Sequence, residues 1–293
     1  MPITDPRNYA FAGLRAASTT HHPHTRHHGP VLRSLAPARR RLVLALVALV
    51  VLVVVAATAF VAVRQVRGEA VADQARPGPV VLVPGYGGTV SDLDPLVAEV
   101  RREGRTAVVF RPSGDGTGDL RTQAKRLADL VERTLREQDG MSVDLVGYSA
   151  GGVTVRLWAN RYDGGSVARR IVTLGSPHHG TELASLATEL APRSCPTACH
   201  QLATDSDLIR QLDHGDETPD GPAWVSIWTA DDRISTPPET ADLDGALDFA
   251  VQQICPGVEV THGQLPQSRV VIAMVEDQLR RSPPALPDPT VCG

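Results

Sequence analysis

The chain has 293 residues, of which 42% are hydrophobic and 21% are charged, and this balance excludes a disordered or collagen-like protein. The formal net charge is −4, but it is unevenly distributed: residues 1–67 carry nine arginines and one acidic residue, a net +8, so residues 68–293 carry −12. A body this acidic argues against binding to a nucleic-acid backbone, which requires a basic face. We therefore expect no nucleic-acid partner.

Residues 1–41 show no apolar periodicity and contain five histidines among prolines and threonines (His21, His22, His24, His27 and His28). A histidine-rich tract can bind metal. However, no cysteine or carboxylate partner and no rigid geometry accompanies these histidines, as a metal site would require. We interpret residues 1–41 as a disordered, basic cytoplasmic tail.

Residues 42–63 form a continuous apolar run in which Thr58 is the one polar residue. About 20 apolar residues are enough to span the hydrocarbon core of a bilayer. Seven arginines precede the run, so its N-terminal side should stay in the cytoplasm and the rest should be exported. We expect a single-pass transmembrane anchor with an extracellular catalytic domain. The alternative is a long signal segment that is cleaved, which would leave a secreted protein.

After a polar linker at residues 64–78, short apolar runs alternate with helical stretches. Such runs, without alternating polar residues, are typical of strands in a parallel sheet buried on both faces. Residues 79–293 therefore predict one α/β domain, a mostly parallel sheet with helices on both faces. The expected strands are 80–83, 106–110, 143–146, 170–174, 224–228 and 258–261. The expected helices lie near 92–102, 119–138, 151–160 and 267–281, and 180–222 should form loops and short helices beside the active site.

All four cysteines, Cys195, Cys199, Cys255 and Cys292, lie in the exported part. An even number of cysteines in an oxidising compartment favours two disulfides. The shortest loops pair Cys195 with Cys199 and Cys255 with Cys292. A metal site at the first pair is the alternative, although no second pair of ligands accompanies it.

The segment Gly147–Gly151 reads Gly-Tyr-Ser-Ala-Gly, follows a predicted strand and precedes a predicted helix. This is the nucleophile-elbow pattern in the context that it requires. The turn is so tight that side chains at the two glycine positions would collide with neighbouring backbone. The strained turn should project the Ser149 hydroxyl over the carboxyl edge of the sheet.

A serine nucleophile needs a base, and the base needs a carboxylate to orient it. After an elbow serine these groups follow in the order acid, then histidine, each just past a strand. Asp231 and Asp232 follow the predicted strand 224–228, and His262 follows the predicted strand 258–261. We select Asp232 as the acid and leave Asp231 as the alternative, with a role in capping the turn.

An oxyanion hole requires two N–H groups directed at the developing negative charge. The N–H of Ala150, directly after the nucleophile, is one candidate. The other should come from the loop after the first strand, Pro84-Gly85-Tyr86-Gly87-Gly88, where glycines allow the backbone to approach a substrate. We assign the N–H of Tyr86 as the second donor. His178 and His179 precede the acid in the chain, so we expect structural or pocket roles for them.

The run 80–88, the elbow, the segment Thr-Leu-Gly-Ser-Pro-His-His-Gly-Thr at 173–181 and the strand leading to Asp232 carry a family resemblance. Together they resemble the small secreted triacylglycerol lipases and esterases of the α/β-hydrolase superfamily, particularly those of high-GC Gram-positive bacteria. The resemblance covers roughly residues 79–279. It implies a catalytic triad of Ser149, Asp232 and His262 and oxyanion donors at Tyr86 and Ala150.

The sequence thus predicts a serine hydrolase that cleaves carboxylic esters, with a lipid or small ester as substrate and the membrane as partner through residues 42–63. We expect a monomer that needs no cofactor and no metal. Two alternatives remain: an acyltransferase acting on envelope lipids with the same triad, and a catalytically inactive binding module on the same fold.

Overall fold

The computed structural model describes residues 37–68, 72–138, 140 and 142–293. By internal contacts the chain divides into two compact units, Met1–Phe60 and Val61–Gly293, which are described separately. Helix α1 (Pro37–Gly68) contains the stretch Arg41–Ala59, which is long and apolar enough to cross a membrane and of which 0% is buried. Residues 1–36 of the predicted tail lie outside the described residues.

The predicted linker, residues 64–78, differs from a free spacer at both of its ends. Helix α1 continues to Gly68, so the first linker residues are helical. From Ala72 onward the chain packs against the rest of the second unit: Ala72 is buried, and the Ser142 hydroxyl donates to the carbonyl oxygen of Arg76 at 3.0 Å. The polar composition of residues 64–78 predicts an exposed linker. Its backbone carbonyls can still accept hydrogen bonds from a neighbouring surface, as Arg76 does here.

The second unit is built on a six-stranded sheet with the order β2-β1-β3-β4-β5-β6, in which all neighbouring strands are parallel. The strands are β1 (Val80–Val83), β2 (Ala107–Val109), β3 (Val143–Tyr148), β4 (Ala168–Leu174), β5 (Ala223–Trp228) and β6 (Leu247–Ala250). Every residue of β1, β3 and β4 is buried. The central strands are apolar on both faces because helices cover both faces, as predicted.

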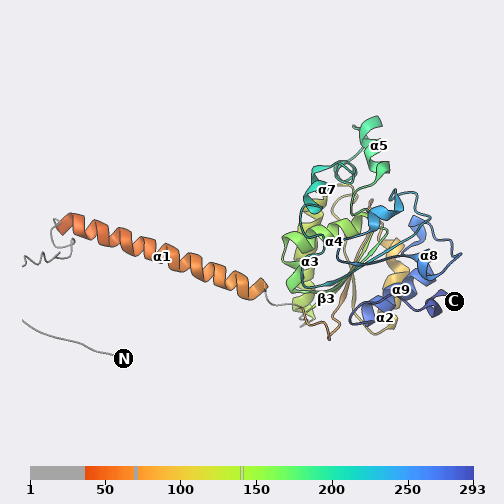
Figure 1. Ribbon diagram of the computed structural model, residues 1–293, viewed down its shortest axis with the longest axis horizontal. Coiled ribbons are helices and arrows are strands. Elements are labelled where there is room, and N and C mark those ends of the chain that lie inside the picture. Colours follow the sequence, from red (N-terminus) through yellow and green to blue (C-terminus); the bar gives the residue numbers. More distant parts are fainter. Residues whose placement is uncertain (1–36, 69–71, 139, 141) are drawn as a thin grey trace, which may run out of the picture. The chain divides into compact units, whose positions relative to one another are not determined.

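Helices α3 (Leu120–Glu137) and α4 (Ala150–Arg161) lie on one side of the sheet, and α2 (Asp94–Arg102) and α9 (Arg269–Arg280) lie on the other (Figure 1). Successive residues of a strand point to opposite faces. Accordingly, Val81 belongs to the core beneath α3 and α4, whereas Leu82 belongs to the core beneath α2 and α9. The predicted α/β layers are confirmed.

One predicted strand is wrong. Residues 258–261 do not join the sheet, and the sixth strand is β6, directly before the short helix α8 (Val251–Ile254). Side chains bind the backbone of residues 258–261 instead: the Thr229 hydroxyl donates to the carbonyl of Val260 at 2.6 Å, and the Gln252 amide donates to that of Val258 at 3.1 Å. The apolar run therefore marks burial of Val260 without strand pairing.

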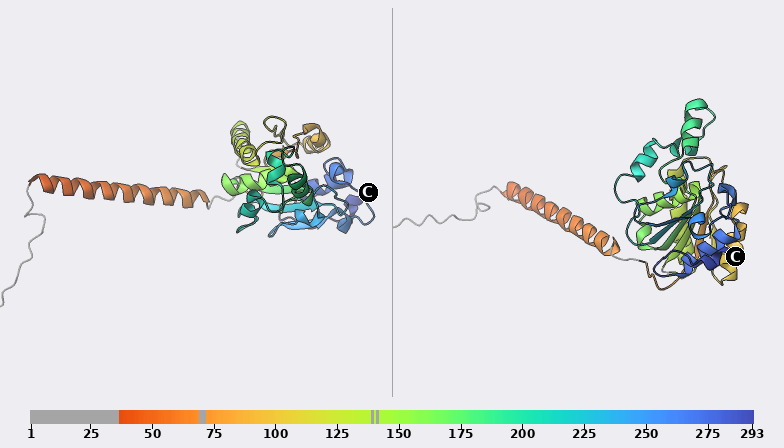
Figure 2. Two further views of the ribbon diagram at one scale, coloured as in Figure 1. Left: turned by 90° about the horizontal axis from the view of Figure 1, so that it is seen from above. Right: turned by 45° about the vertical axis from the view of Figure 1, so that its right-hand side comes forward.

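Residues 180–222 form three short helices, α5 (Glu182–Leu190), α6 (Thr197–Gln201) and α7 (Asp207–Leu212). Figure 2 shows α5 standing out from the body of the second unit. Both predicted disulfides are present: Cys195–Cys199 closes the turn into α6, and Cys255–Cys292 ties the C-terminal turn to the end of α8. The 3₁₀ turns are η2 (Val90–Leu93), η3 (Gly164–Ser166), η4 (Pro238–Ala241), η5 (His262–Gln264) and η6 (Pro289–Cys292).

Candidate active site

Ser149 occupies the sharp turn between β3 and α4, with φ 53° and ψ −127°. This is a costly backbone conformation for a residue with a side chain, and such strain is found at functional sites. The flanking glycines are sterically required. A Cβ atom at Gly147 would lie 2.6 Å from the Cα atom of Gly152, and one at Gly151 would lie 2.3 Å from the carbonyl oxygen of Val83. The turn has the geometry that the pentapeptide predicts.

Three loops bring Ser149, His262 and Asp232 together into a hydrogen-bonded chain. The Nε2 atom of His262 lies 2.9 Å from Oγ of Ser149, and its Nδ1 atom lies 2.7 Å from Oδ2 of Asp232. All three residues are buried, at 8%, 6% and 5% exposure respectively. Because a carboxylate only accepts, Nδ1–H donates to Asp232 and Nε2 is left to accept the Ser149 hydroxyl proton. The arrangement can deprotonate the serine.

The two neighbouring aspartates have different partners. Oδ1 of Asp232 accepts the N–H groups of Ile234 and Ser235, both at 2.8 Å, which fixes the carboxylate with Oδ2 directed at His262. Oδ2 of Asp231 accepts instead from the side chain of Gln252 at 3.0 Å and from the N–H of Val260 at 3.3 Å. Asp232 is thus the acid that faces the histidine, and Asp231 holds the segment that leads to it.

Tyr148, directly before the serine, supports His262 from below. Its hydroxyl donates to the backbone carbonyl of His262 at 3.2 Å, and the two rings pack with centroids 5.3 Å apart. Burial, together with the nearby carboxylates of Asp92 and Asp232, raises the pKa of Tyr148 above its ordinary value, so the hydroxyl remains a donor. The elbow pattern leaves this position open, so the sequence carries no signal for the contact.

The two predicted oxyanion donors lie beside Ser149. Ala150 is the first residue of α4, where an N–H has no partner within the helix. The loop after β1 passes close to the nucleophile: a Cβ atom at Gly85 would lie 3.1 Å from Cβ of Ser149. Among the described residues, neither the N–H of Tyr86 nor that of Ala150 donates to a protein acceptor. Both groups are available to a bound oxygen.

Ser149 opens into a cavity of about 260 Å³, which we call the Ser149 chamber. Most of its lining is apolar, and α5 and α6 supply much of it. The lining residues are Tyr86, Ser149, Pro177, Thr181, Leu183, Ala184, Ala187, Cys199, Leu202, Ile234 and Ser235. Residues 180–222 therefore form a wall of the site. The sequence predicts that this segment lies beside the active site, but it does not predict the cavity.

Exposed apolar side chains gather around this chamber. Among the described residues from 72 onward, seven large hydrophobic side chains are exposed, and five of them lie on α5 or line the chamber: Tyr86, Leu183, Leu186, Leu190 and Ile234. Three of the five are leucines of α5, and Leu190 is 75% exposed. Apolar patches of this kind mark surfaces that bind apolar partners.

The adjacent histidines 178 and 179 do not join the hydrogen-bonded chain of Ser149, His262 and Asp232. His178 is fully buried, with Nε2 3.1 Å from the Thr173 hydroxyl, and burial and the charge of Arg156 hold its pKa well below the usual range. Nε2 of His179 lies 2.9 Å from Oε1 of Glu217. A neutral, enclosed histidine such as His178 has a structural role. Its position in the chain, before Asp232, indicates the same, because the base histidine of this pattern follows the acid.

Within the described part of the chain, two groups of side chains bring metal-type donors within 4.8 Å of one another: His179–Asp213–Glu217 and Glu99–Glu103–Glu276. Each already faces an arginine. Arg156 donates to Asp213 at 3.1 Å and lies 3.5 Å from Glu217, and Arg102 pairs with the glutamates of the second group. The arginines offset the negative charge that would attract a cation.

Residues 79–213 match the family model described as palmitoyl protein thioesterase. No curated protein sequence matches the chain. Among solved structures, it resembles Aspergillus fumigatus lipase B, with a TM-score of 0.65, 20% identity and coverage of 75% of this chain and 58% of that one. This chain thus spans well under two thirds of the length of the fungal lipase.

Two bacterial structures show the same likeness. The mature form of Bacillus licheniformis lipase BlEst2 matches with a TM-score of 0.57 and 19% identity, covering 71% of this chain and 94% of that one. A gene product of Listeria innocua matches with a TM-score of 0.52 and 14% identity, covering 73% of this chain and 97% of that one. These likenesses and the parallel sheet show that the second unit has the α/β-hydrolase fold, as expected from the sequence.

Proposed function

We propose that the protein is a serine hydrolase that cleaves carboxylic esters of acyl lipids. The observation that carries the proposal is the hydrogen-bonded chain Asp232–His262–Ser149, whose serine lines an apolar chamber. A nucleophile, a base and an orienting acid in this relation make up the constellation of acyl-transfer enzymes.

In the first half of the reaction, Oγ of Ser149 attacks the ester carbonyl carbon while Nε2 of His262 takes its proton. The negative charge that develops on the carbonyl oxygen is stabilised by the N–H groups of Ala150 and Tyr86. Asp232 stabilises the imidazolium and keeps the ring oriented. The C–O bond then breaks, His262 returns its proton to the leaving alcohol, and an acyl-serine remains.

In the second half, water replaces the alcohol. His262 takes a proton from the water as it attacks the acyl carbon, and the same two N–H groups hold the oxyanion. Collapse of this intermediate breaks the bond to Oγ, and His262 returns the proton to Ser149. The products are a carboxylic acid and the free enzyme, and the cycle requires no metal or organic cofactor.

An acyl lipid as substrate is supported by the chamber and its rim. The chamber is lined mainly by apolar side chains, and the exposed leucines of α5 adjoin it. The names of the similar structures, lipases from Aspergillus and Bacillus, point the same way. The match to the palmitoyl protein thioesterase family favours a second candidate, an acyl thioester, because the same triad can attack a thioester carbonyl.

Anchoring in the membrane is part of the proposal. The apolar stretch Arg41–Ala59 is long enough to span a bilayer, arginines precede it, and both disulfides fit an oxidising compartment. We place residues 1–41 in the cytoplasm and the catalytic domain, residues 79–293, outside the cell as a monomer. Secretion after cleavage is the alternative, and the mass of the mature protein distinguishes the two.

The test is hydrolysis of p-nitrophenyl butyrate by the full-length protein in detergent, compared with the Ser149→Ala variant. We expect turnover that falls by at least about 10⁴-fold in the variant. Ser268→Ala, at the start of α9, is the matched control and should keep full activity. Undiminished turnover in Ser149→Ala would contradict the mechanism. Transfer of the acyl group to added glycerol faster than hydrolysis would favour the acyltransferase alternative, and absence of turnover would favour the binding module.

A further inference from the structure

The walls of the Ser149 chamber are fixed by bonds that connect three separate segments. Thr181 lies at their junction: its N–H donates to the carbonyl of Leu202 at 2.8 Å, and its hydroxyl donates to the carbonyl of Ile234 at 2.6 Å. The Thr236 N–H in turn donates to the Thr181 hydroxyl at 3.0 Å. The start of α5, the end of α6 and the loop after Asp232 are thereby held in one arrangement.

The α6 wall is held from its other side as well. The N–H of Ala198 donates to the carbonyl of Thr117 at 3.0 Å, and the Gln201 side chain accepts the N–H of Leu120 at 2.8 Å. The Cys195–Cys199 disulfide closes the turn that leads into α6, and Cys199 itself lines the chamber. A wall fixed by a covalent bond and by hydrogen bonds to the start of α3 and the loop before it cannot retreat freely before a long ligand.

The volume of the chamber sets the length of chain that it can bury. A methylene group takes up about as much space as one water molecule, roughly 30 Å³. The chamber holds about 260 Å³, so it accommodates about eight or nine carbons. Any further carbons of an acyl chain would extend past the exposed Leu183 and Ile234 at the rim and remain in water.

We propose that the chamber is a medium-chain acyl site, whose limit of about eight or nine carbons is set by Ala187 on α5 and Leu202 after α6. This inference rests on the proposed function and specifies its substrate. Ala187 is half-buried on the chamber side of α5, whereas its neighbour Leu186 is 51% exposed on the outer side. The residue at 187 therefore controls the free volume, and the residue at 186 does not.

The first measurement is kcat/KM of the full-length protein for p-nitrophenyl esters from acetyl to hexadecanoyl. We expect a rise of about fourfold for each methylene that becomes buried, and no further rise beyond about eight or nine carbons. We call the chain length at which kcat/KM stops rising the break. Ala187→Leu adds three carbon atoms to the chamber and should move the break to about five or six carbons. Leu202→Ala should move it to longer chains, and Leu186→Ala should leave it unchanged.

The second measurement does not depend on turnover. Calorimetric binding of saturated fatty acids to Ser149→Ala and to the double variant Ser149→Ala/Ala187→Leu is compared in one detergent, so that partition into micelles is common to both. The affinity should stop rising at about eight or nine carbons in the first protein and about three carbons earlier in the second.

The outcomes separate the two proposals. If the protein hydrolyses esters and Ala187→Leu shifts the break to shorter chains, both the proposed function and the medium-chain site are supported. A shifted break in binding without any hydrolysis supports the chamber and overturns the proposed function. Hydrolysis that keeps rising to the hexadecanoyl ester, or a break that stays in place in Ala187→Leu, overturns the medium-chain site while the hydrolase stands.

Discussion

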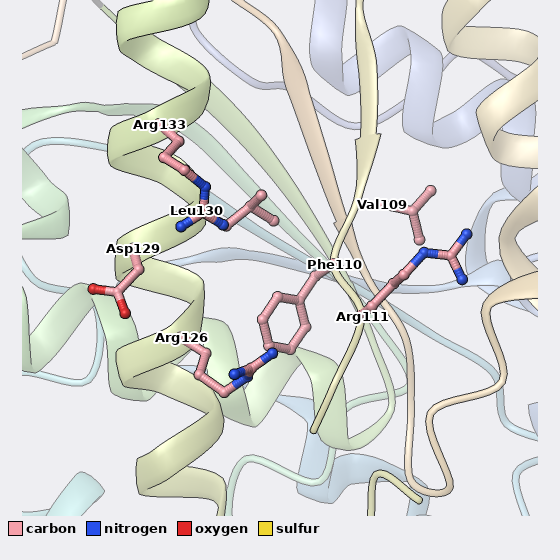
Figure 3. A pocket seen from close by; sticks show the side chains of 7 residues that line it. All are labelled: Val109, Phe110, Arg111, Arg126, Asp129, Leu130 and Arg133. Atoms are coloured by element: carbon pink, nitrogen blue, oxygen red, sulfur yellow. The ribbon is translucent and has the colours of Figure 1, made fainter. Parts of the chain in front are cut away.

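Two cavities of the second unit have almost the same volume and opposite chemistry. The Ser149 chamber measures about 260 Å³, and a groove between β2 and α3 measures about 280 Å³. This second cavity, which we call the arginine groove, is lined by Val109, Phe110, Arg111, Arg126, Asp129, Leu130 and Arg133. Figure 3 shows Arg126 and Arg133 projecting from α3 on either side of Leu130, while Asp129 points away. Its lining holds three cations and no nucleophile.

The difference lies in how firmly the polar groups are held. Behind Ser149 of the chamber, Asp232 accepts two backbone N–H groups and His262 is supported by Tyr148. The arginines of the groove are exposed, and within the described residues none of them forms an ion pair. Reactive groups must be preorganised to act in catalysis, and cavity size alone does not provide this.

The largest expected effect comes from removing His262, the base proposed for Ser149 of the chamber. His262→Ala should lower kcat for ester hydrolysis by about 10⁶-fold, because the serine then has no proton acceptor. The double variant Arg126→Ala/Arg133→Ala should stay within about twofold, because exposed unpaired charges contribute little. Initial rates at saturating p-nitrophenyl butyrate measure both. Equal losses in the two variants would remove the distinction between the cavities.

The next effect separates the two aspartates. Asp232→Asn should lower kcat by about 10⁴-fold, because the amide cannot stabilise the imidazolium or fix its tautomer. Asp231→Asn keeps an acceptor for the N–H of Val260 and should lose less than about tenfold. Steady-state kinetics on the pair provide the measurement. A greater loss of kcat in Asp231→Asn than in Asp232→Asn would show that Asp231, and not Asp232, is the acid that orients His262.

A smaller effect is expected at Tyr148, a positioning residue that acts through His262. Tyr148→Phe removes one buried hydrogen bond, worth about 1 kcal/mol, and should lower kcat about fivefold while KM stays unchanged. Thermal unfolding of the variant controls for stability. A rise in KM at constant kcat would place Tyr148 in substrate binding instead.

The smallest effect concerns a carboxyl outside both cavities. Burial and the nearby Asp242 raise the pKa of Asp248 to about 7, above an unfolded value near 3.9. The folded state therefore holds the proton more tightly, and stability falls as the pH rises from about 4 to about 7. Asp248→Asn removes this loss and should increase the free energy of unfolding at pH 8 by about 1 kcal/mol, after allowance for solvent screening.

The same substitution should change little at pH 3, about one unit below the unfolded pKa, where the wild-type carboxyl is mostly neutral in both the folded and unfolded states. Denaturant unfolding at the two pH values is the measurement. Because Asp248 lines neither cavity, ester hydrolysis should be unaffected at either pH. A gain that is equal at both pH values would exclude the raised pKa as its cause.

The sheet was predictable wherever burial and strand pairing coincide. Residues 80–83 are apolar, buried and paired, so their pattern identifies β1. Two strand assignments failed for one reason: within residues 258–261 Val260 is buried although the segment pairs with no strand, and β6 (Leu247–Ala250) pairs while half of it is only partly buried. Apolar runs report burial, whereas pairing at a sheet edge depends on tertiary contacts that a local pattern does not contain.

The candidate site was predictable to the extent that it depends on steric rules and chain order. The glycines around Ser149 are required by close contacts, and the acid and the histidine follow in a fixed order. Tyr148 and the chamber were not predictable. The chamber forms where α5, α6 and the loop after Asp232 meet beside Ser149, and Tyr148 acts through its contact with His262. No spacing in the sequence encodes either contact.

The most direct test of the catalytic triad is covalent labelling of the full-length protein with a fluorophosphonate, followed by digestion and mass spectrometry. A serine activated by His262 attacks the phosphorus and releases fluoride, so we expect a single adduct on Ser149. Labelling should be lost in Ser149→Ala and should be at least about 10³-fold slower in His262→Ala. Absence of the adduct from the wild-type protein, or labelling at the same rate in His262→Ala, would contradict an activated serine at this elbow.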